Sequence, residues 1–425
     1  MYWRVEYIIL IVLSTTIDYN IAKRLSKLNN PRVRKNLLLI SIASNLTLLL
    51  TFKYLDFIIT SINGIFSTHI AEIGLILPVG ISFYTFQTMS YTIDVFNKRF
   101  KAVKDLSQFS LFVCFFPQLV AGPIERSKKL IPQLRSFEAI TWNNFRRGSR
   151  LILYGLFKKV VIADRLAYFV DLVFDSPQEY AGFQVAIAIV FFAFQIYCDF
   201  SGYSDIAIGV ARIFGVRLTL NFNKPYLSSS VTEFWRRWHI TLSTWFRDYV
   251  YIPLGGNKRG YKRSSINLLI TFAVSGLWHG ANWTFIIWGV YHGVIVFLER
   301  LGSKYINIST NKVIMQVFTF IVVCIGWVFF RANSYDDIVT IFSNLLYFDP
   351  NTLSIDMFQY SNRPEFLLSF AFIGLLVLEE IYIKKFILLF RVRYKHLKHI
   401  YLIILFLFIL FFGIRNEEQF IYFQF

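Results

Sequence analysis

The chain has 425 residues, of which 56% are hydrophobic, 19% are aromatic and only 16% are charged, and its mean hydropathy is +0.51. Soluble domains carry about 25% charged residues, so this composition excludes a soluble globular protein and predicts a polytopic membrane protein in the lipid bilayer. The formal net charge of +18 does not indicate nucleic-acid binding, because the basic residues cluster in short loops between apolar runs, as the positive-inside rule predicts.

Eight apolar runs are candidate membrane spans, each of which needs about 20 residues. The shorter run 109–123 is interrupted by Pro117, Gly122 and Pro123 and lies between basic loops, which predicts a re-entrant segment shielded by protein. Residues 148–176 carry charges within an apolar pattern and predict an interfacial helix followed by one span. The eight candidate spans are 7–20, 36–52, 73–96, 181–214, 266–298, 313–330, 365–382 and 399–414.

The loops between the spans predict how the chain lies across the membrane. The loop 61–72 contains no Lys or Arg and is expected outside, and counting spans from the basic loops also puts the tail 415–425 outside the cytoplasm. We see no internal repeat, linker or low-complexity segment. The sequence therefore predicts one all-α membrane domain over 1–425.

The stretch 228–256 predicts an amphipathic helix at the membrane interface. Ser230 and Glu233 have the S-x-x-E spacing of a capping box, which starts a helix. At about 100° per residue, His239 falls on the border between the apolar and polar faces. There it can point toward a cavity, or it can be an ordinary polar residue at the interface. The apolar face comprises Phe234, Trp235, Trp238, Leu242, Trp245, Phe246 and Tyr249.

His279 follows Trp278 in a stretch that otherwise reads as lipid-soluble. An ionisable side chain at membrane depth is costly and suggests a functional site, although a histidine bonded to a backbone carbonyl is the structural alternative. His292 repeats the pattern of an aromatic residue before and a glycine after. On one continuous helix the two histidines would lie about 20 Å apart, so they predict no shared metal ion, and no Asp, Glu or Cys cluster completes a metal site.

Asp199 and Asp205 lie within the apolar run 181–214. Two acids at that depth imply either a polar cavity or hydrogen bonds between helices. Taken singly, each acid fits a role in holding helices together. Together with His279 they suggest a water-accessible pocket within the membrane.

Six stretches of the sequence carry a family resemblance: LPVGISFYTFQTMSYTIDVF (77–96), FFPQLVAGPIER (115–126), QIYCDFSGYSDIAIGVARIFG (195–215), NFNKPYLSSSVTEFWRRWHITLSTWFRDYVYIPLGG (221–256), GLWHGANWTFIIWGVYHG (276–293) and FIYFQF (420–425). With these stretches, the chain resembles the membrane-bound O-acyltransferase (MBOAT) family, in the branch of the alginate O-acetylases and peptidoglycan O-acetyltransferases. The resemblance implies a helical bundle with re-entrant segments and interfacial amphipathic helices around a central funnel that meets a tunnel. It also implies that this chain, which starts where relatives have one or two more hydrophobic segments before it, begins late or is shortened.

The resemblance implies roles for the two motif histidines. The histidine of the WHG motif falls on His279, which we interpret as the general base, since an apolar site keeps imidazole neutral and able to accept a proton. His239 is expected to orient the thioester or assist proton transfer. Trp278, Asn282 and Trp283 are expected to shape the pocket, and Asn282 is a candidate donor to the developing oxyanion.

The resemblance also implies the donor, acceptor and location. The acyl donor is cytoplasmic acetyl-CoA, no metal cofactor is involved, and the acceptor is an exported polysaccharide, reached with an extracytoplasmic partner resembling an SGNH hydrolase. The location implied is the bacterial cytoplasmic (inner) membrane. Open alternatives are D-alanyl transfer to teichoic acid, a transporter, which predicts internal repeats that we do not see, and a non-enzymatic scaffold.

The end of the chain adds Tyr422 to the expected site. FIYFQF has the pattern F-x-Y-x-x-F, which resembles the C-terminal motif of a small protein that accompanies D-alanyl transferases. By that resemblance Tyr422 would accept the acetyl group and pass it on. The alternative is an aromatic anchor at the outer membrane interface.

Overall fold

The computed structural model describes residues 5–119, 122–136, 140–258, 260–305, 311–347, 363–392, 397–414 and 420–421. Every regular element within these residues is a helix, which confirms the predicted all-α class. The chain folds as two compact units: residues 1–148 with 210–219, and residues 149–209 with 220–425. That the whole chain forms one membrane domain remains a prediction.

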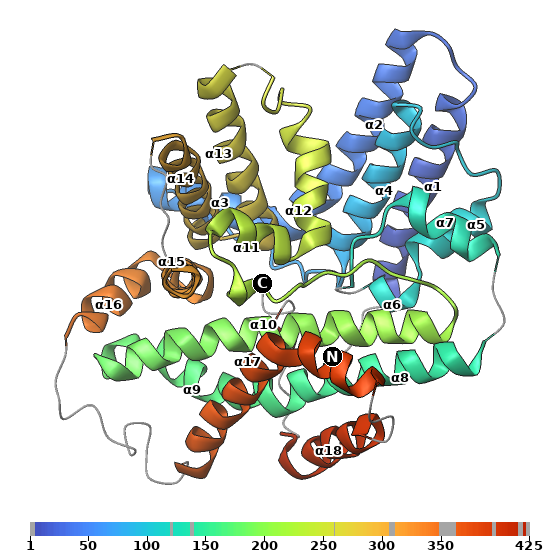
Figure 1. The fold of residues 1–425 in the computed structure, drawn as a ribbon. Helices are drawn as coiled ribbons and strands as arrows, with labels where there is room; N and C mark the ends of the chain where they lie inside the picture. Colours follow the sequence, from blue (N-terminus) through green and yellow to red (C-terminus); the bar gives the residue numbers. More distant parts are fainter. Residues whose placement is uncertain are drawn as a thin grey trace. The chain divides into compact units, whose positions relative to one another are not determined.

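The first unit is built around α1, α2 and α4, which lie side by side in Figure 1 and contact one another. Asn30 starts α2 by accepting hydrogen bonds from two backbone N–H groups, and Pro31 occupies its first position, where a missing N–H costs nothing. The helices that belong to this unit are α1 (Ile8–Leu25), α2 (Pro31–Leu49), a π-helical turn (Leu50–Tyr54), α3 (Leu55–Phe66), α4 (Ile81–Phe96), α5 (Leu106–Val113), α6 (Phe116–Leu119) and α7 (Ser127–Arg135).

A buried polar network joins the three central helices of the first unit. The carboxylate of Asp18 accepts hydrogen bonds from Ser41 and from Asn45, whose amide nitrogen lies 2.8 Å away. The Asn45 carbonyl oxygen in turn accepts from Ser14 at 2.9 Å and from Thr88 at 3.2 Å. Such bonds between side chains hold apolar helices in one register.

The second unit contains the long central helix α10 and both motif histidines. In Figure 1 α13 and α14 stand beside each other, and they are in extensive contact. The α-helices and π-helical turns of this unit are a π-helical turn (Phe157–Ala163), α9 (Asp164–Asp175), α11 (Val231–Arg237), α12 (Ile240–Phe246), a second π-helical turn (Arg247–Tyr251), α13 (Gly260–His279), α14 (Trp283–Tyr305), α15 (Lys312–Arg331), α16 (Tyr335–Leu345), α17 (Arg363–Val392) and α18 (Leu397–Phe412), together with most of α8 (Trp142–Leu156) and of α10 (Phe183–Ile213).

The prediction of one span over 266–298 is wrong, because the chain turns back after His279 and forms a hairpin of α13 and α14. One helix of that length would extend about 50 Å, well beyond the roughly 30 Å hydrocarbon core. Glycines let the two backbones touch: a methyl group on Gly276 would collide with the carbonyl of Phe285 on α14. Small residues at such crossings are typical of membrane helix pairs.

Among the residues that the structure describes, five helical segments are long and apolar enough to cross a membrane. The predicted span 73–96 begins later than expected, at Ile81, after Gly80 with a φ of 78°. The described part of the predicted re-entrant run 109–123 includes the end of α5 and the short helix α6, and the position of the run in the membrane remains a prediction. The five segments are Val5–Leu25, Pro31–Phe66, Phe183–Ile213, Trp283–Gly302 and Lys312–Arg331.

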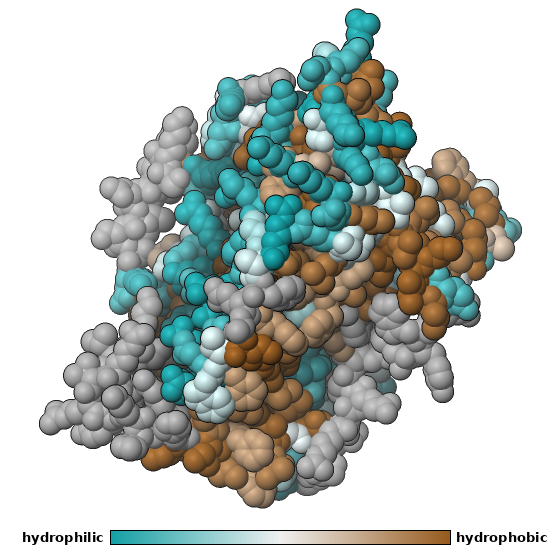
Figure 2. Space-filling model, turned by 90° about the vertical axis from the view of Figure 1, so that its right-hand side faces the viewer, coloured by the Kyte–Doolittle hydropathy of each residue, from teal (hydrophilic) through white to brown (hydrophobic). Residues whose placement is uncertain are grey.

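The surface agrees with a location in the bilayer. Figure 2 shows hydrophobic side chains exposed over broad areas of the face in view, with hydrophilic side chains gathered in other areas. Large apolar residues such as Ile9, Phe318 and Phe411 are more than half exposed. In water this surface would drive aggregation, whereas lipid tails solvate it.

Candidate functional site

His239 lies at a break between two helices, so the prediction of a single amphipathic helix over 228–256 is wrong. The residue adopts the left-handed conformation, with φ of 40° and ψ of 53°, between α11 and α12. A non-glycine residue in this conformation is uncommon and suggests a local constraint. The predicted helix start at Ser230 is confirmed, because the Ser230 hydroxyl accepts from the backbone N–H of Glu233 at 3.0 Å. The Glu233 carboxylate accepts from the backbone N–H of Ser229 at 2.7 Å, and not from that of Ser230 as in a complete capping box.

The aromatic face predicted for this stretch is core rather than lipid interface. Five of its members are buried, so protein covers the face that the sequence pattern assigned to the membrane. The period of apolar residues reports burial, and it does not distinguish burial in lipid from burial against protein. The buried members are Phe234, Trp238, Leu242, Trp245 and Phe246.

Asn221 stabilises the helix break at His239 by accepting hydrogen bonds from the residues that follow it. Its backbone carbonyl accepts from Ile240 N–H at 2.9 Å, and its side-chain oxygen accepts from the backbone N–H and the hydroxyl of Thr241, at 3.3 and 2.9 Å. The Asn221 side-chain nitrogen lies 3.3 Å from the Ser204 hydroxyl on α10. These bonds tie the start of α12 to Asn221 and explain how the break is maintained.

The same oxygen of Asn221 fixes the imidazole of His239. His239 Nδ1 lies 3.1 Å from Asn221 Oδ1. Because this oxygen already accepts from Thr241, it is the carbonyl end of the amide, so Nδ1 carries the hydrogen and donates it. The second ring nitrogen, Nε2, is then the basic one. His239 lies outside the five candidate spans, and burial lowers its pKa to about 3, which keeps the ring neutral near pH 7.

His279 is the last residue of α13, and its buried ring lies in an aromatic enclosure. The ring centroid lies 5.0 Å from that of Trp278, 5.0 Å from that of Trp288 on α14 and 5.4 Å from that of Phe330 on α15. The centroids of His279 and His239 are 6.4 Å apart. The two histidines that the sequence singled out 40 positions apart therefore belong to one site.

His292 lies next to this enclosure, contrary to the expected separation of the two histidines along one helix. Its ring contacts Trp288 at 5.4 Å between centroids, and Trp288 contacts His279. The hairpin places the rings of His279 and His292 against the same tryptophan, Trp288, because α14 runs back along α13. His292 is fully buried, and neither ring nitrogen has a hydrogen-bond partner among the residues that the structure describes.

The structure places the three weaker pocket candidates differently. Trp278 is buried and contacts both motif histidines, with centroids 6.2 Å from His239 and 5.0 Å from His279. The Asn282 side chain caps α14 by accepting from Thr284 N–H at 3.0 Å. Trp283 is 54% exposed at the start of that helix. Of the three, Trp278 is the one that the structure places against the histidines.

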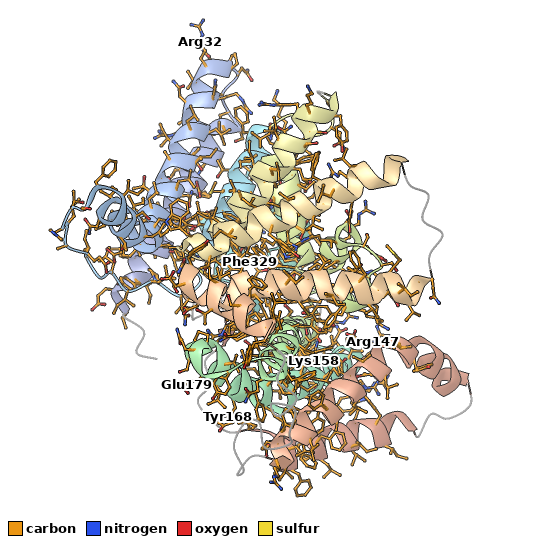
Figure 3. All side chains as sticks on the ribbon, turned by 90° about the vertical axis from the view of Figure 1, so that its left-hand side faces the viewer. Arg32, Arg147, Lys158, Tyr168, Glu179 and Phe329 are labelled. Carbon is orange, nitrogen blue, oxygen red and sulfur yellow. The ribbon has the colours of Figure 1, made fainter. Side chains whose placement is uncertain are left out.

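Asp199 and Asp205 each form an ion pair with a lysine of the π-helical turn Phe157–Ala163. Lys158 Nζ lies 2.5 Å from an Asp205 oxygen, and Lys159 Nζ lies 2.7 Å from Asp199 Oδ1. Figure 3 shows Lys158 among the packed helices of its unit. The acids could be singled out from the sequence as charges within an apolar span, whereas the lysines lie in the stretch 148–176, where charges interrupt the apolar pattern. Contact of either acid with a substrate remains a prediction.

Tyr422 lies outside the described residues, so its role also remains a prediction. The two described residues before it lie against α10. The ring of Phe420 contacts those of Phe200 and Tyr203, with centroids 6.1 and 4.9 Å away, and Phe200 contacts His239 at 4.7 Å.

The residues that sequence reasoning missed contact the two histidines from distant segments. Asn221, Phe200, Trp288 and Phe330 have ordinary side chains whose importance depends on the fold. Three of them lie within stretches of family resemblance, and that was the available signal. Among the described residues, no group of three or more His, Cys, Asp or Glu side chains is arranged to hold a metal ion.

Comparison with known proteins gives one consistent result. The sequence model of MBOAT, the membrane-bound O-acyltransferase family, matches residues 3–335. The chain is 35% identical over 374 residues to the peptidoglycan O-acetyltransferase of Helicobacter pylori, covering 81% of this chain and 71% of that protein. It is 40% identical over 358 residues to the probable alginate O-acetylase of Azotobacter vinelandii, covering 83% and 71%. It is 29% identical over 284 residues to the teichoic acid D-alanyltransferase of Bacillus subtilis, covering 62% and 70%.

Proposed function

The chain belongs to the membrane-bound O-acyltransferase family, and from this premise we propose that it is an O-acetyltransferase that modifies an exported polysaccharide. The proposed donor is acetyl-CoA on the cytoplasmic side, and the proposed location is the cytoplasmic (inner) membrane of a bacterium. Relatives named as a peptidoglycan O-acetyltransferase, at 35% identity, and a probable alginate O-acetylase, at 40% identity, support acetyl as the group transferred.

The observation that carries the proposal is the pair of buried histidines whose ring centroids lie 6.4 Å apart. They come from different segments, the break before α12 and the end of α13, and both are enclosed by aromatic side chains. A water-poor enclosure strengthens electrostatic interactions and protects a thioester from hydrolysis. Two imidazoles this close can act on the same small reacting group.

In the proposed reaction, a hydroxyl attacks the carbonyl carbon of the thioester. His279 removes the hydroxyl proton, the oxygen–carbon bond forms, and the carbon–sulfur bond breaks. The sulfur leaves as a thiolate and takes the proton from the His279 imidazolium, so an ester and a free thiol result. Neutral His239, whose Nδ1 hydrogen is held by Asn221, has Nε2 as its basic nitrogen and assists proton transfer in this proposal.

The proposed first acceptor is the phenol of Tyr422 in the terminal FIYFQF segment. An extracytoplasmic partner with a serine-hydrolase-like active site would then take the acetyl group from the tyrosine ester and place it on the polysaccharide. Alginate-like exopolysaccharide and peptidoglycan are the acceptor classes, because the relatives named above are a probable alginate O-acetylase and a peptidoglycan O-acetyltransferase. D-alanyl transfer has weaker support, since the teichoic acid enzyme is similar over a smaller share of this chain.

The test replaces each histidine in the protein expressed in its own host. His279→Ala and His239→Asn should each abolish ester-linked acetate on the cell's polysaccharide, measured by mass spectrometry after mild base release. Asn is the chosen replacement at position 239 because Asn tolerates the left-handed backbone found there. Unchanged acetylation in well-expressed variants would refute the enzymatic role and favour a scaffold.

A second measurement tests whether Tyr422 accepts the acetyl group from acetyl-CoA. Purified protein is incubated with acetyl-CoA, and the mass of the C-terminal peptide is measured. A gain of one acetyl group on the wild-type peptide, absent in Tyr422→Phe, supports the relay. Active protein whose tail never gains that mass would refute it and would favour direct transfer to the glycan.

A further inference from the structure

The π-helical turn Phe157–Ala163 interacts with the C-terminal part of the chain through two sets of contacts. In a π-helical turn the backbone hydrogen-bond pattern shifts, which releases a carbonyl from its usual helical partner. The Val160 carbonyl accepts from the backbone N–H of Ile414 at 2.9 Å, directly after α18. Arg165 in the following helix also donates to the Phe412 carbonyl, at 2.8 Å. The chain leaving α18 is therefore docked on this turn.

The second set of interactions is a series of ion pairs that leads to Ile421. Lys159 Nζ lies 2.7 Å from Asp164 Oδ1 and 2.7 Å from Asp199 Oδ1. The other oxygen of Asp199 accepts from the backbone N–H of Ile421 at 2.7 Å. Asp199 and Ile421 are both buried. A hydrogen bond from a backbone amide to a buried carboxylate is one of the stronger kinds.

A close helix contact sets this geometry. A methyl group on Gly155 would lie 2.5 Å from the Gly202 carbonyl on α10, and one on Gly202 would lie 2.8 Å from the Gly155 carbonyl. Because both positions are glycine, the end of α8 rests directly on α10. The lysine that follows one turn later is then within reach of Asp199.

We infer that the turn Phe157–Ala163 and Asp199 form a tail seat, which holds the C-terminal segment at Ile414 and Ile421 and thereby positions the residue that follows Ile421. Consecutive Cα atoms are about 3.8 Å apart, so an anchor at Ile421 limits how far Tyr422 can move. Phe420 contacts Phe200, and Phe200 contacts His239. The importance of Tyr422 rests on the proposed function, whereas the tail seat itself does not.

Asp199 is accordingly a positioning residue. Its charge is balanced by Lys159, so it can accept from a backbone amide within a buried site at low cost. Asp164 shares the same ammonium and keeps Lys159 turned toward α10. This gives the Asp199 side chain a role in holding the C-terminal segment at Ile421, which its sequence position did not suggest.

The test compares Ile421→Pro with Ile421→Val in the full-length purified protein. Proline removes the N–H that Asp199 accepts, whereas valine keeps it and changes the side chain little. Carboxypeptidase release of the terminal residues, followed by intact mass, reports how often the tail leaves the seat. We expect release to be roughly 10- to 100-fold faster in Ile421→Pro than in wild type, since that is the range for losing a bond to a charged acceptor. Ile421→Val should match wild type.

Asp199→Ala supplies the other half of the test. It should accelerate release by a similar factor, and Ile421→Pro combined with Asp199→Ala should be no faster than either alone, because both remove the same bond. Wild-type release rates in Ile421→Pro, or multiplied effects in the double variant, would overturn the tail seat. Acetylation of Tyr422 is measured on the same samples. Faster release with no acetyl group on the wild-type tail refutes the tyrosine relay and leaves the tail seat standing.

Discussion

Replacing Asn221 by Asp tests how the site controls the protonation of His239. The substitution keeps an oxygen where Oδ1 accepts from His239 Nδ1, 3.1 Å away, and from Thr241. It places a negative charge beside the imidazole, which favours the imidazolium and raises its pKa from about 3. Replacement by Ala is less informative, because three buried donors lose their acceptor at about 1–3 kcal/mol each, enough to threaten folding.

The assay is thiol release from acetyl-CoA by purified protein between about pH 5 and about pH 9, where an unperturbed histidine would titrate. In wild type His239 stays neutral over this whole pH range, so its titration does not lower the activity at the acid end of the profile. In Asn221→Asp the raised pKa makes His239 increasingly cationic as pH falls. Activity should therefore drop at the acid end, roughly tenfold per pH unit below the new pKa, and recover at the alkaline end.

A matched control is Thr241→Val, which removes the hydroxyl bond to Asn221 Oδ1 but leaves the partner of His239 in place. Its pH profile should keep the wild-type shape, whatever its effect on stability. A profile for folded Asn221→Asp that superimposes on wild type down to about pH 5 would contradict the reasoning, because it would mean that this oxygen does not govern the ring.

Three further predictions concern stability. The pKa of His239 is about 3 in the folded protein and about 6.5 in the unfolded chain, so the folded protein binds fewer protons at this residue. The protein should therefore unfold more easily as the pH falls from 6.5 toward 3. In thermal melts, His239→Asn should reduce this dependence of stability on pH. Lys158→Met should cost about 3 kcal/mol by leaving Asp205 without its partner, and a double variant with Asp205→Asn should recover most of this in denaturant titrations. Gly289→Ala should cost about 1–3 kcal/mol by pressing on Phe272, whereas Gly302→Ala on the same helix, where a methyl group meets open space, should not lower the melting temperature.

The sequence by itself determined the class of protein and the identity of the two central histidines. Apolar runs near 20 residues specify membrane helices because lipid forces each segment to satisfy its own backbone hydrogen bonds. The helix start at Ser230 could also be predicted, since the Ser230 hydroxyl and the N–H that it accepts from lie only three residues apart. The local sequence around His279 and His239 left open whether their roles are structural or catalytic. The motif resemblance implied a catalytic role for both.

Tertiary structure alone decided how these parts meet, because the decisive contacts join residues far apart in the chain. His239 leaves the helical pattern because Asn221, 18 positions earlier, holds the backbone around it. Asp199 accepts from Ile421, 222 positions later. A periodic pattern shows which residues are buried but not what buries them, so the hairpin that brings His279 to Trp288 and the docking of the tail on α10 were visible only in the folded chain.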